Sequence, residues 1–234
     1  MSAPYYVFFD VDDTLIEWTV RWPEAFAQAA REVGVAFSPE EALAALKTAL
    51  STGIYTDLVH RHAADDDDRA FWLAYDGRLL EILGVKQGLR QATERVVDIL
   101  TQPDSRRLFP DVPDVLDSLS QAGAKLGVVT GRPRAEPDLE ALGVRSYFHP
   151  LIDAFAARSG KDEGHMFHLA AEAAAAHDAP AWHVGDNYDL DVLGARAAGL
   201  RPVLLDRTGA HEEADCPRIE SLRELPSLLL ETTG

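Results

Sequence analysis

Short apolar runs rich in β-branched and aromatic residues recur along the chain, and in its second half they alternate with helical patterns. Such alternation indicates strand–helix–strand crossovers, which build a parallel sheet covered on both faces. The expected fold class is therefore α/β, with a Rossmann-like parallel sheet of about five strands. The expected strands are residues 5–9, 125–129, 151–155, 182–184 and 202–205, and the helices expected between the later ones are residues 111–122, 164–177 and 189–198.

A long stretch with little strand signal separates the first expected strand from the others. Its amphipathic patterns predict four helices, over residues 22–33, 39–50, 69–83 and 89–100. We therefore expect a helical insertion, residues 17–104, between two parts of one core, residues 1–16 and 105–234. The run Asp65–Asp68 fits the solvated start of a helix better than a metal site, because four adjacent acids cannot all face one ion.

Composition excludes several classes of partner. The formal charge of −17 argues against binding a nucleic-acid polymer, which requires positive charge. No apolar run approaches the roughly 18 residues that span a bilayer, so no membrane partner is expected. A single cysteine, Cys216, and an N-terminus without a basic segment before an apolar one favour the cytoplasm. The sequence does not distinguish a monomer from a homodimer.

Ligands of open parallel sheets bind outside the carboxyl ends of the strands, and polar residues of this chain fall at those ends. Asp10 ends the first strand and Asp12 follows it, although such a pair also occurs in ordinary turns. After the second strand comes Thr130-Gly131-Arg132, where a hydroxyl and backbone amides can grip phosphate oxygens. Gly131 allows a ligand to approach the backbone closely, and Arg132 either adds charge or lies in solvent.

Two later segments supply a base and further acids. Lys161, one of only four lysines, follows the third expected strand, although a lone lysine is usually solvated. The fourth strand ends in Asp186, and Asp189 and Asp191 follow where a helix begins. Asp189 fits a helix N-terminus, whereas Asp186 lies directly at the strand end. Carboxylate oxygens of this kind suit Mg²⁺, which leaves places for water and phosphate.

Taken together and in this order, the four segments resemble those of the haloacid dehalogenase-like hydrolase superfamily, over about residues 4–16 and 105–210. The resemblance implies its phosphatase branch, with the insertion as a helical cap. It implies Asp10 as nucleophile and Asp12 as general acid/base. It further implies phosphate binding by Thr130, and Lys161 as the base that steadies nucleophile and phosphate.

The resemblance also implies a Mg²⁺ site. Its ligands would be Asp10, the backbone carbonyl of Asp12, and Asp186, with Asp191 supporting the metal or the lysine. The implied substrate is a small phosphorylated metabolite, such as a sugar phosphate, phosphoglycolate or a nucleoside monophosphate. Mg²⁺ and Lys161 would supply the local positive charge that an acidic protein needs in order to bind phosphate.

The chain departs from the family pattern at two places. Many relatives have prolines just after the lysine, whereas this chain continues Asp162-Glu163-Gly164. Asp13 stands where many relatives have glycine, in a turn that aspartate can also occupy.

Three other functions remain open. A 2-haloacid dehalogenase needs neither Mg²⁺ nor a leaving-group acid and generally lacks an acid at the position of Asp12, so this residue favours phosphate. A phosphomutase uses the same core but protects its aspartyl-phosphate from water. A non-catalytic binding protein of this fold would usually have lost a reactive group, and none is missing here.

Overall fold

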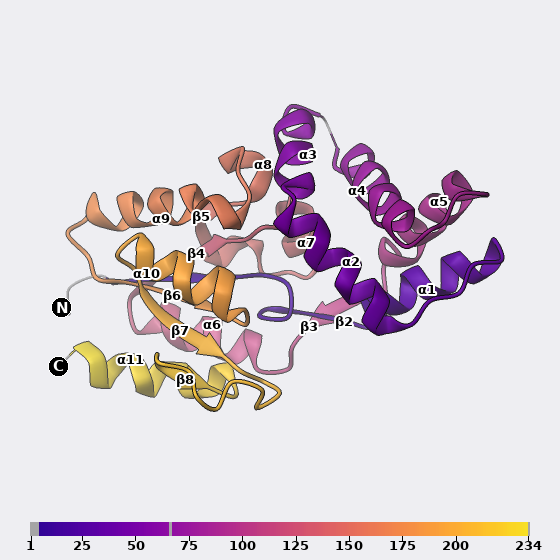
Figure 1. Cartoon of the computed structure of the whole chain (residues 1–234). Coiled ribbons are helices and arrows are strands. Elements are labelled where there is room, and N and C mark those ends of the chain that lie inside the picture. Colours follow the sequence, from indigo (N-terminus) through magenta and orange to yellow (C-terminus); the bar gives the residue numbers. More distant parts are fainter. Residues whose placement is uncertain (1–4, 66, 234) are drawn as a thin grey trace. The chain divides into compact units, whose positions relative to one another are not determined.

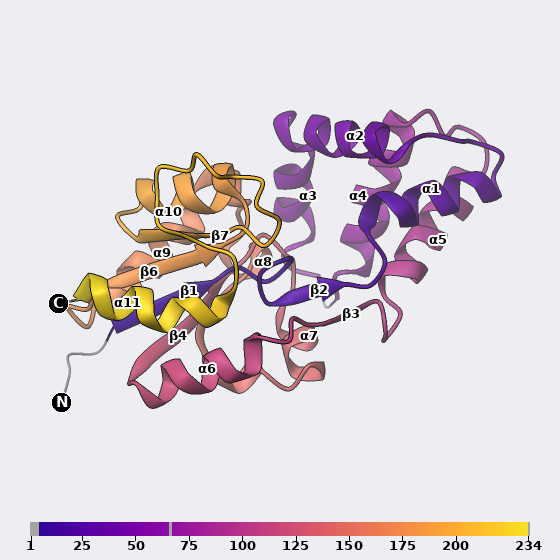
Figure 2. The same cartoon turned by 90° about the horizontal axis from the view of Figure 1, so that it is seen from below.

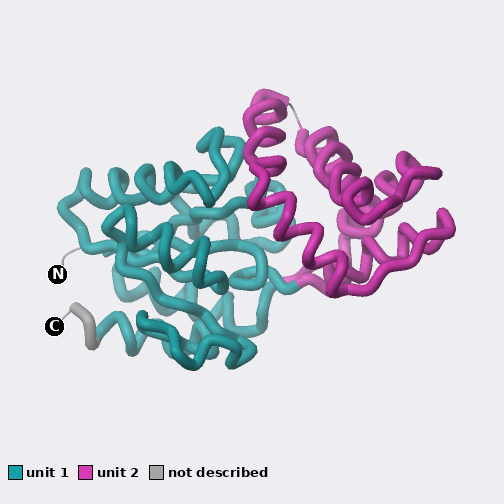
Figure 3. Tube along the Cα trace, in the orientation of Figure 1, with its two compact units in different colours: residues 1–17, 108–234 teal, residues 18–107 magenta. Residues whose placement is uncertain are grey.

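The computed structural model describes residues 5–65 and 67–233, which belong to two compact units. Residues 1–17 and 108–234 form the core unit, and residues 18–107 form the insertion (Figure 3). The boundaries expected from the sequence, residues 17 and 104, lie within three residues of these limits. The candidate site residues all fall in the core unit.

A parallel sheet organises the core unit, with strand order β5-β4-β1-β6-β7-β8 among the described residues. Because every neighbouring pair is parallel, the carboxyl ends of all the strands lie along one edge. The strands are β1 (Tyr5–Phe9), β4 (Ala124–Val129), β5 (Phe148–Ile152), β6 (Ala181–Gly185), β7 (Arg201–Leu205) and β8 (Arg218–Ile219).

Helices cover both faces of this sheet. Figures 1 and 2 show α9 (His165–Ala175) and α10 (Leu193–Ala197) on one face, and α6 (Val112–Gln121) and α11 (Leu225–Thr233) on the other. Shorter elements connect them: α7 (Glu136–Ala141), α8 (Ala154–Ala157), the 3-10 turns η1 (Arg145–Tyr147), η2 (Lys161–Glu163) and η4 (Leu222–Glu224), and the π-helical turn η3 (Tyr188–Val192). The expected α/β class with a parallel, doubly covered sheet is confirmed.

The burial of β1 explains why its sequence reads as one continuous apolar run. Val7 and Phe9 point into the cluster that α6 and α11 cover, whereas Tyr6 and Phe8 point to the opposite face. All four side chains are buried, as expected for a strand in a sheet with two covered faces. A buried β1 fixes the position of Asp10, which follows directly.

One expected strand was misplaced. The sequence predicted residues 151–155, but β5 ends at Ile152 and α8 begins at Ala154. The reason is the side chain of Asp153, whose Oδ1 accepts the backbone N–H of Ala156 at 2.8 Å and so caps α8. The other four expected strands are confirmed to within one residue at each end, and the short β8 was not predicted.

The insertion consists of helices, with the short pair β2 (Ile16–Trp18) and β3 (Arg106–Leu108) where the chain enters and leaves it. Its helices are α1 (Trp22–Glu32), α2 (Pro39–Ser51), α3 (Ile54–His62), α4 (Arg69–Ile82) and α5 (Leu89–Leu100). Four of them match the predicted helices, and α3 was missed. No helix among the described residues is long and apolar enough to cross a membrane.

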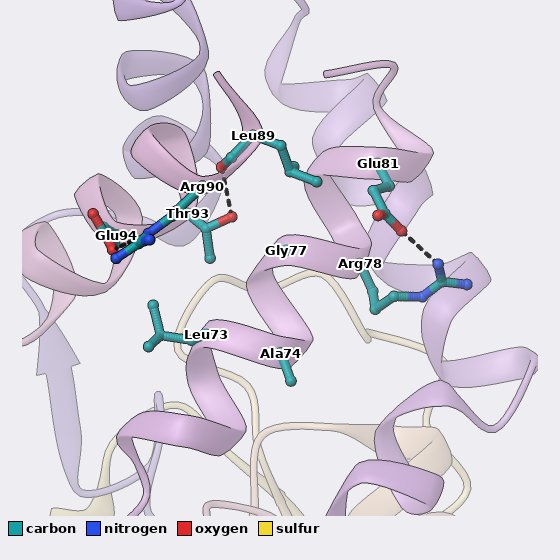
Figure 4. Close-up of a pocket in the computed structure, with 9 residues that line it drawn as sticks. All are labelled: Leu73, Ala74, Gly77, Arg78, Glu81, Leu89, Arg90, Thr93 and Glu94. Carbon is teal, nitrogen blue, oxygen red and sulfur yellow. Dashed lines mark hydrogen bonds and ion pairs between the residues drawn. The ribbon is translucent and has the colours of Figure 1, made fainter. Parts of the chain in front are cut away.

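Aromatic side chains form much of the interior of the insertion. Phe26, Phe71 and Tyr75 are buried, and the Phe71 and Tyr75 rings stack at 5.9 Å. The acidic run precedes α4 as predicted: Asp68 accepts the indole N–H of Trp72 at 2.7 Å, while Asp66 lies outside the described residues. Between α4 and α5 a surface pocket of about 420 Å³ opens beside Gly77 and Thr93 (Figure 4).

Candidate active site

The loop after β1 presents the first two acids. The backbone N–H of Asp10 donates to the carbonyl of Val184 at 2.9 Å, which ties the end of β1 to the end of β6. Asp10 is buried, whereas the side chain of Asp12 is 37 % exposed. Asp13 has φ of 57°, so the loop turns through the left-handed region at the position where many relatives have glycine. Aspartate tolerates this conformation, which is why the departure leaves the turn intact.

Lys161 reaches Asp10 from η2. Its Nζ lies 2.5 Å from Oδ1 of Asp10 and 2.5 Å from Oδ1 of Asp191, and only 8 % of its side chain is exposed. Burial alone would discharge the amine, but the two carboxylates outweigh it and raise the pKa of Lys161. Lys161 is therefore a buried cation of the site, and the solvated position common for a lone lysine is wrong here.

Three donors hold Asp191. Its Oδ1 accepts from Lys161 and, at 2.9 Å, from Nε2 of His183, and its Oδ2 accepts the backbone N–H of Asn187 at 3.1 Å. Burial opposes the charge, but Lys161 and His183 outweigh it and lower the pKa of Asp191. Asp191 is thus an ionised anchor for Lys161.

His183 supports this anchor from inside the sheet. It lies on β6, fully buried, with its ring edge-on to Phe167 at 5.0 Å. Burial lowers the pKa of His183, which favours the neutral ring. Among the described residues Nδ1 has no hydrogen-bond partner, so we assign the tautomer in which Nε2–H donates to Asp191.

Three carboxylates meet around one ammonium. One carboxylate oxygen from each of Asp10, Asp186 and Asp191 lies within 4.8 Å of the others. Burial raises the pKa of Asp10 to about 7, with Lys161 opposing the rise and Asp191 adding to it. Burial likewise raises the pKa of Asp186 to about 8, and the charges of Asp10 and Asp191 add to it. The positive charge of Lys161 alone therefore does not compensate the negative charge of the three carboxylates.

This donor set fits a hard divalent cation. Mg²⁺ prefers oxygen ligands and is commonly bound through one or two carboxylates, with further places for water or phosphate. Asp10 and Asp186 are the carboxylates best suited to hold it, because the oxygens of Asp191 already accept hydrogen bonds from the protein. A cation here would compensate the charge that burial makes unfavourable.

The turn after β4 brings the remaining predicted residues to the same edge of the sheet. Thr130 is buried, its backbone N–H donates to Ile152, and its Oγ1 accepts the N–H of Arg132 at 3.2 Å. Gly131 lies against Lys161, since a Cβ added to it would be 3.7 Å from the lysine Cγ. Gly131 thus lies beside the lysine that contacts Asp10, and Thr130 directly precedes Gly131.

Arg132 is buried, so of the two alternatives that the sequence left open, the position in solvent is wrong. Its Nε donates to Oδ2 of Asp138 at 2.7 Å, and its NH1 lies 3.4 Å from Oδ1 of Asp12. The side chain does not extend into solvent because Asp138, six residues later on α7, supplies a buried counter-charge. The guanidinium therefore connects α7 with the loop after β1.

Comparison with known proteins identifies the family of the chain. Residues 6–199 match the haloacid dehalogenase-like hydrolase family. The chain belongs to this family of hydrolases.

Relatives of the family resemble the chain over nearly its whole length. Haloacid dehalogenase-like hydrolase domain-containing protein 3 of Danio rerio is 27% identical, over 97% of this chain and 97% of the relative. The glyceraldehyde 3-phosphate phosphatase of Methanopyrus kandleri is 29% identical, over 89% of this chain and 86% of the relative. A 2-haloacid dehalogenase from Pseudomonas syringae has a similar structure, with TM-score 0.64 and 25% identity, covering 97% and 99% of the two chains.

The sequence did not reveal the residues that hold the predicted site residues in place. His183 and Asp138 carry no motif signal: the first reads as a strand residue, and the second reads as an ordinary first-turn acid of a helix. Arg207 was also missed. It pairs with both oxygens of Asp111 and donates to the carbonyl of Thr14 at 3.1 Å, which braces the loop after β1.

Proposed function

We propose that this hydrolase is a Mg²⁺-dependent phosphatase that hydrolyses a small phosphomonoester through an aspartyl-phosphate on Asp10. The observation that carries the proposal is the buried cluster in which Lys161 contacts Asp10 and Asp191 beside Asp186. The name of the Methanopyrus kandleri relative supports phosphate-ester chemistry. Bound Mg²⁺ would supply positive charge that orients the phosphoryl group and stabilises its oxygens.

Asp10 performs the first displacement. Lys161 holds its Oδ1, so we assign Oδ2 as the atom that attacks phosphorus. The new Asp10–phosphorus bond forms as the ester P–O bond breaks, and the bonding pair leaves with the alcohol oxygen. Asp12, two residues further along the same loop, donates the proton that the leaving oxygen takes.

The second displacement regenerates the enzyme. Asp12, now a carboxylate, removes a proton from water, and the hydroxide attacks phosphorus. The bond between phosphorus and Asp10 breaks, which releases inorganic phosphate and restores the Asp10 carboxylate. Thr130 and the amides after it would bind the phosphoryl oxygens throughout, and Lys161 would offset their charge.

Substrate selection is assigned to the helical insertion acting as a cap. The net charge of −17 disfavours polyanions, so we propose a small phosphorylated metabolite rather than a nucleic-acid end. Dehalogenation is the second candidate, because a 2-haloacid dehalogenase shares the fold. The carboxyl of Asp12 argues against it, since displacement of a halide requires no proton donor.

Phosphate release tests the proposal. p-Nitrophenyl phosphate and a panel of metabolite monoesters would be assayed with Mg²⁺ and with EDTA, beside 2-haloacids assayed for halide release. We expect phosphate release that EDTA abolishes and Mg²⁺ restores. Asp10→Asn should abolish it and also prevent acid-stable labelling of the protein by phosphate, whereas Asp114→Asn, an exposed acid on α6, should retain it.

Two outcomes contradict the proposal. Halide release without phosphate release would assign the protein to the dehalogenases. Phosphate release that persists in Asp10→Asn would show that another group is the nucleophile.

A further inference from the structure

Arg132 is more firmly held than a surface arginine. Its backbone N–H donates to Oγ1 of Thr130 and its carbonyl accepts the N–H of Ala154, which fixes the residue at the end of β4. Its Nε and NH2 both contact Oδ2 of Asp138. The exposed fractions of the two side chains are 6 % and 10 %, so this ion pair is shielded from water.

The remaining side of the guanidinium faces Asp12. NH1 lies 3.4 Å from Oδ1 of Asp12, an approach between residues 120 positions apart in the sequence. The Asp12 side chain is far more exposed than Arg132, and it extends from a loop rather than from a strand. A charged neighbour that is itself held in place restricts the orientations open to such a carboxyl.

We propose that Arg132, held by Asp138, is a positioning residue that orients the Asp12 carboxyl toward the leaving group. The inference rests on the proposed function, in which Asp12 is the general acid/base. It differs from phosphate binding by Arg132, because the N–H groups of Nε and NH2 contact Asp138 and NH1 faces Asp12. General acid catalysis depends on placing the donor within hydrogen-bond reach of the leaving oxygen, so misorientation lowers the rate of that step.

The leaving group provides a readout that a structural role would not change. When the P–O bond of an alkyl phosphate breaks, the alkoxide needs a proton from Asp12. p-Nitrophenolate leaves as a stable anion and needs no proton from Asp12. Loss of Asp12 orientation should therefore slow transfer of the phosphoryl group to Asp10 from alkyl esters much more than from the aryl ester, whereas hydrolysis of the aspartyl-phosphate is common to both.

The experiment compares kcat and KM of wild type, Asp138→Asn, Arg132→Met and the double variant. The substrates are p-nitrophenyl phosphate and an alkyl phosphate that the wild type hydrolyses. We expect kcat/KM for the alkyl ester, which reports transfer of the phosphoryl group to Asp10, to fall roughly 10- to 100-fold, and kcat/KM for p-nitrophenyl phosphate to fall less than about threefold. Asp12→Asn should show the same selectivity. The double variant should lose no more than Arg132→Met, because Asp138 acts through Arg132.

Arg145→Met is the matched control. Arg145 also pairs with an acid of α7, since its Nε lies 2.7 Å from Oε1 of Glu136, but it belongs to no part of the proposed site. It should change the rates with the two esters by the same small factor. Should Arg132→Met fail to fold, Asp138→Asn and Arg132→Lys carry the test, and Arg132→Lys should retain part of the alkyl-ester activity because it keeps the charge.

The possible results separate the alternatives. Equal losses of kcat/KM with both esters, accompanied by a lower kcat, would overturn the inference and leave a structural role for the pair. Equal losses of kcat/KM that arise from KM alone, with kcat unchanged, would also overturn it and assign Arg132 to phosphate binding. A wild type that hydrolyses no ester would overturn the proposed function, and this inference with it.

Discussion

Replacing Gly185 by alanine would place a methyl group against the anchor of Lys161. Gly185 is the last residue of β6, and a Cβ built on it would overlap the Asp191 carboxyl and lie 2.7 Å from the Asp191 Cβ. Carbon atoms in contact are ordinarily about 3.5–4.0 Å apart. The aspartate must therefore move by roughly 1 Å, because the new methyl group is attached to the backbone of a packed strand, which cannot move away.

That shift sets the expected magnitude. Asp191 holds Lys161, and Lys161 holds Asp10, the proposed nucleophile, so the displacement passes to Asp10 through two hydrogen bonds of 2.5 Å. A misplacement of about 1 Å in an active site can lower a rate by about 100-fold. Such a loss corresponds to roughly 2.7 kcal/mol in the activation free energy. Overpacking should also reduce the free energy of unfolding by about 1–3 kcal/mol.

The assay measures kcat for phosphate release together with urea unfolding, so that the two losses are separated. Gly77→Ala is the matched control in the insertion. A Cβ there would lie 3.5 Å from Oγ1 of Thr93, an ordinary contact beside the pocket of Figure 4. Because Gly77 lies inside α4, alanine should leave kcat unchanged and stabilise the fold by up to about 1 kcal/mol.

Either of two results would refute the reasoning. If Gly185→Ala folds as stably as wild type and retains kcat within about twofold, the position of Asp191 does not control the nucleophile. A large loss of stability at saturating Mg²⁺ with normal kcat in the folded fraction would refute it equally.

Three further predictions concern buried polar groups. Burial raises the pKa of Asp76 well above its usual value, and its Oδ1 has no hydrogen-bond partner among the described residues. Wild-type stability should therefore fall as pH rises above about 4, and urea titrations should show Asp76→Asn gaining on wild type over that range; parallel curves would contradict this. Burial opposes ionisation of Asp111, but hydrogen bonds from Arg207 and its neighbours lower its pKa. Asp111→Asn should cost about 1–3 kcal/mol at pH 7, and thermal melts should show this cost disappearing below about pH 4; a constant difference would argue against it. His183→Phe preserves the ring packing but removes the donor to Asp191, so kcat should fall roughly tenfold, and His183→Gln should recover part of it; equal rates in both variants would exclude a role for the donor.

The sequence determined the fold class and the edge of the sheet at which the proposed site lies. Apolar runs that end in Asp10, Thr130 and Asp186 must lie side by side once the strands are parallel, because parallel strands end at a common edge. Local patterns also determined four of the five helices that the structure describes in the insertion. These features depend on residues close together in the chain.

Tertiary structure decided which side chains touch. Lys161 reaches Asp10 across 151 residues, and Arg132 reaches Asp12 across 120. Neither contact follows from spacing, because the loops that carry these residues could direct them toward solvent. The end of β5 was likewise decided by one capping contact of Asp153, since an apolar run does not show where a strand ends and a helix begins. The tertiary structure also determined the pKa of each buried acid. The pKa of Asp186 is raised and that of Asp191 is lowered, because only Asp191 accepts hydrogen bonds from Lys161 and His183.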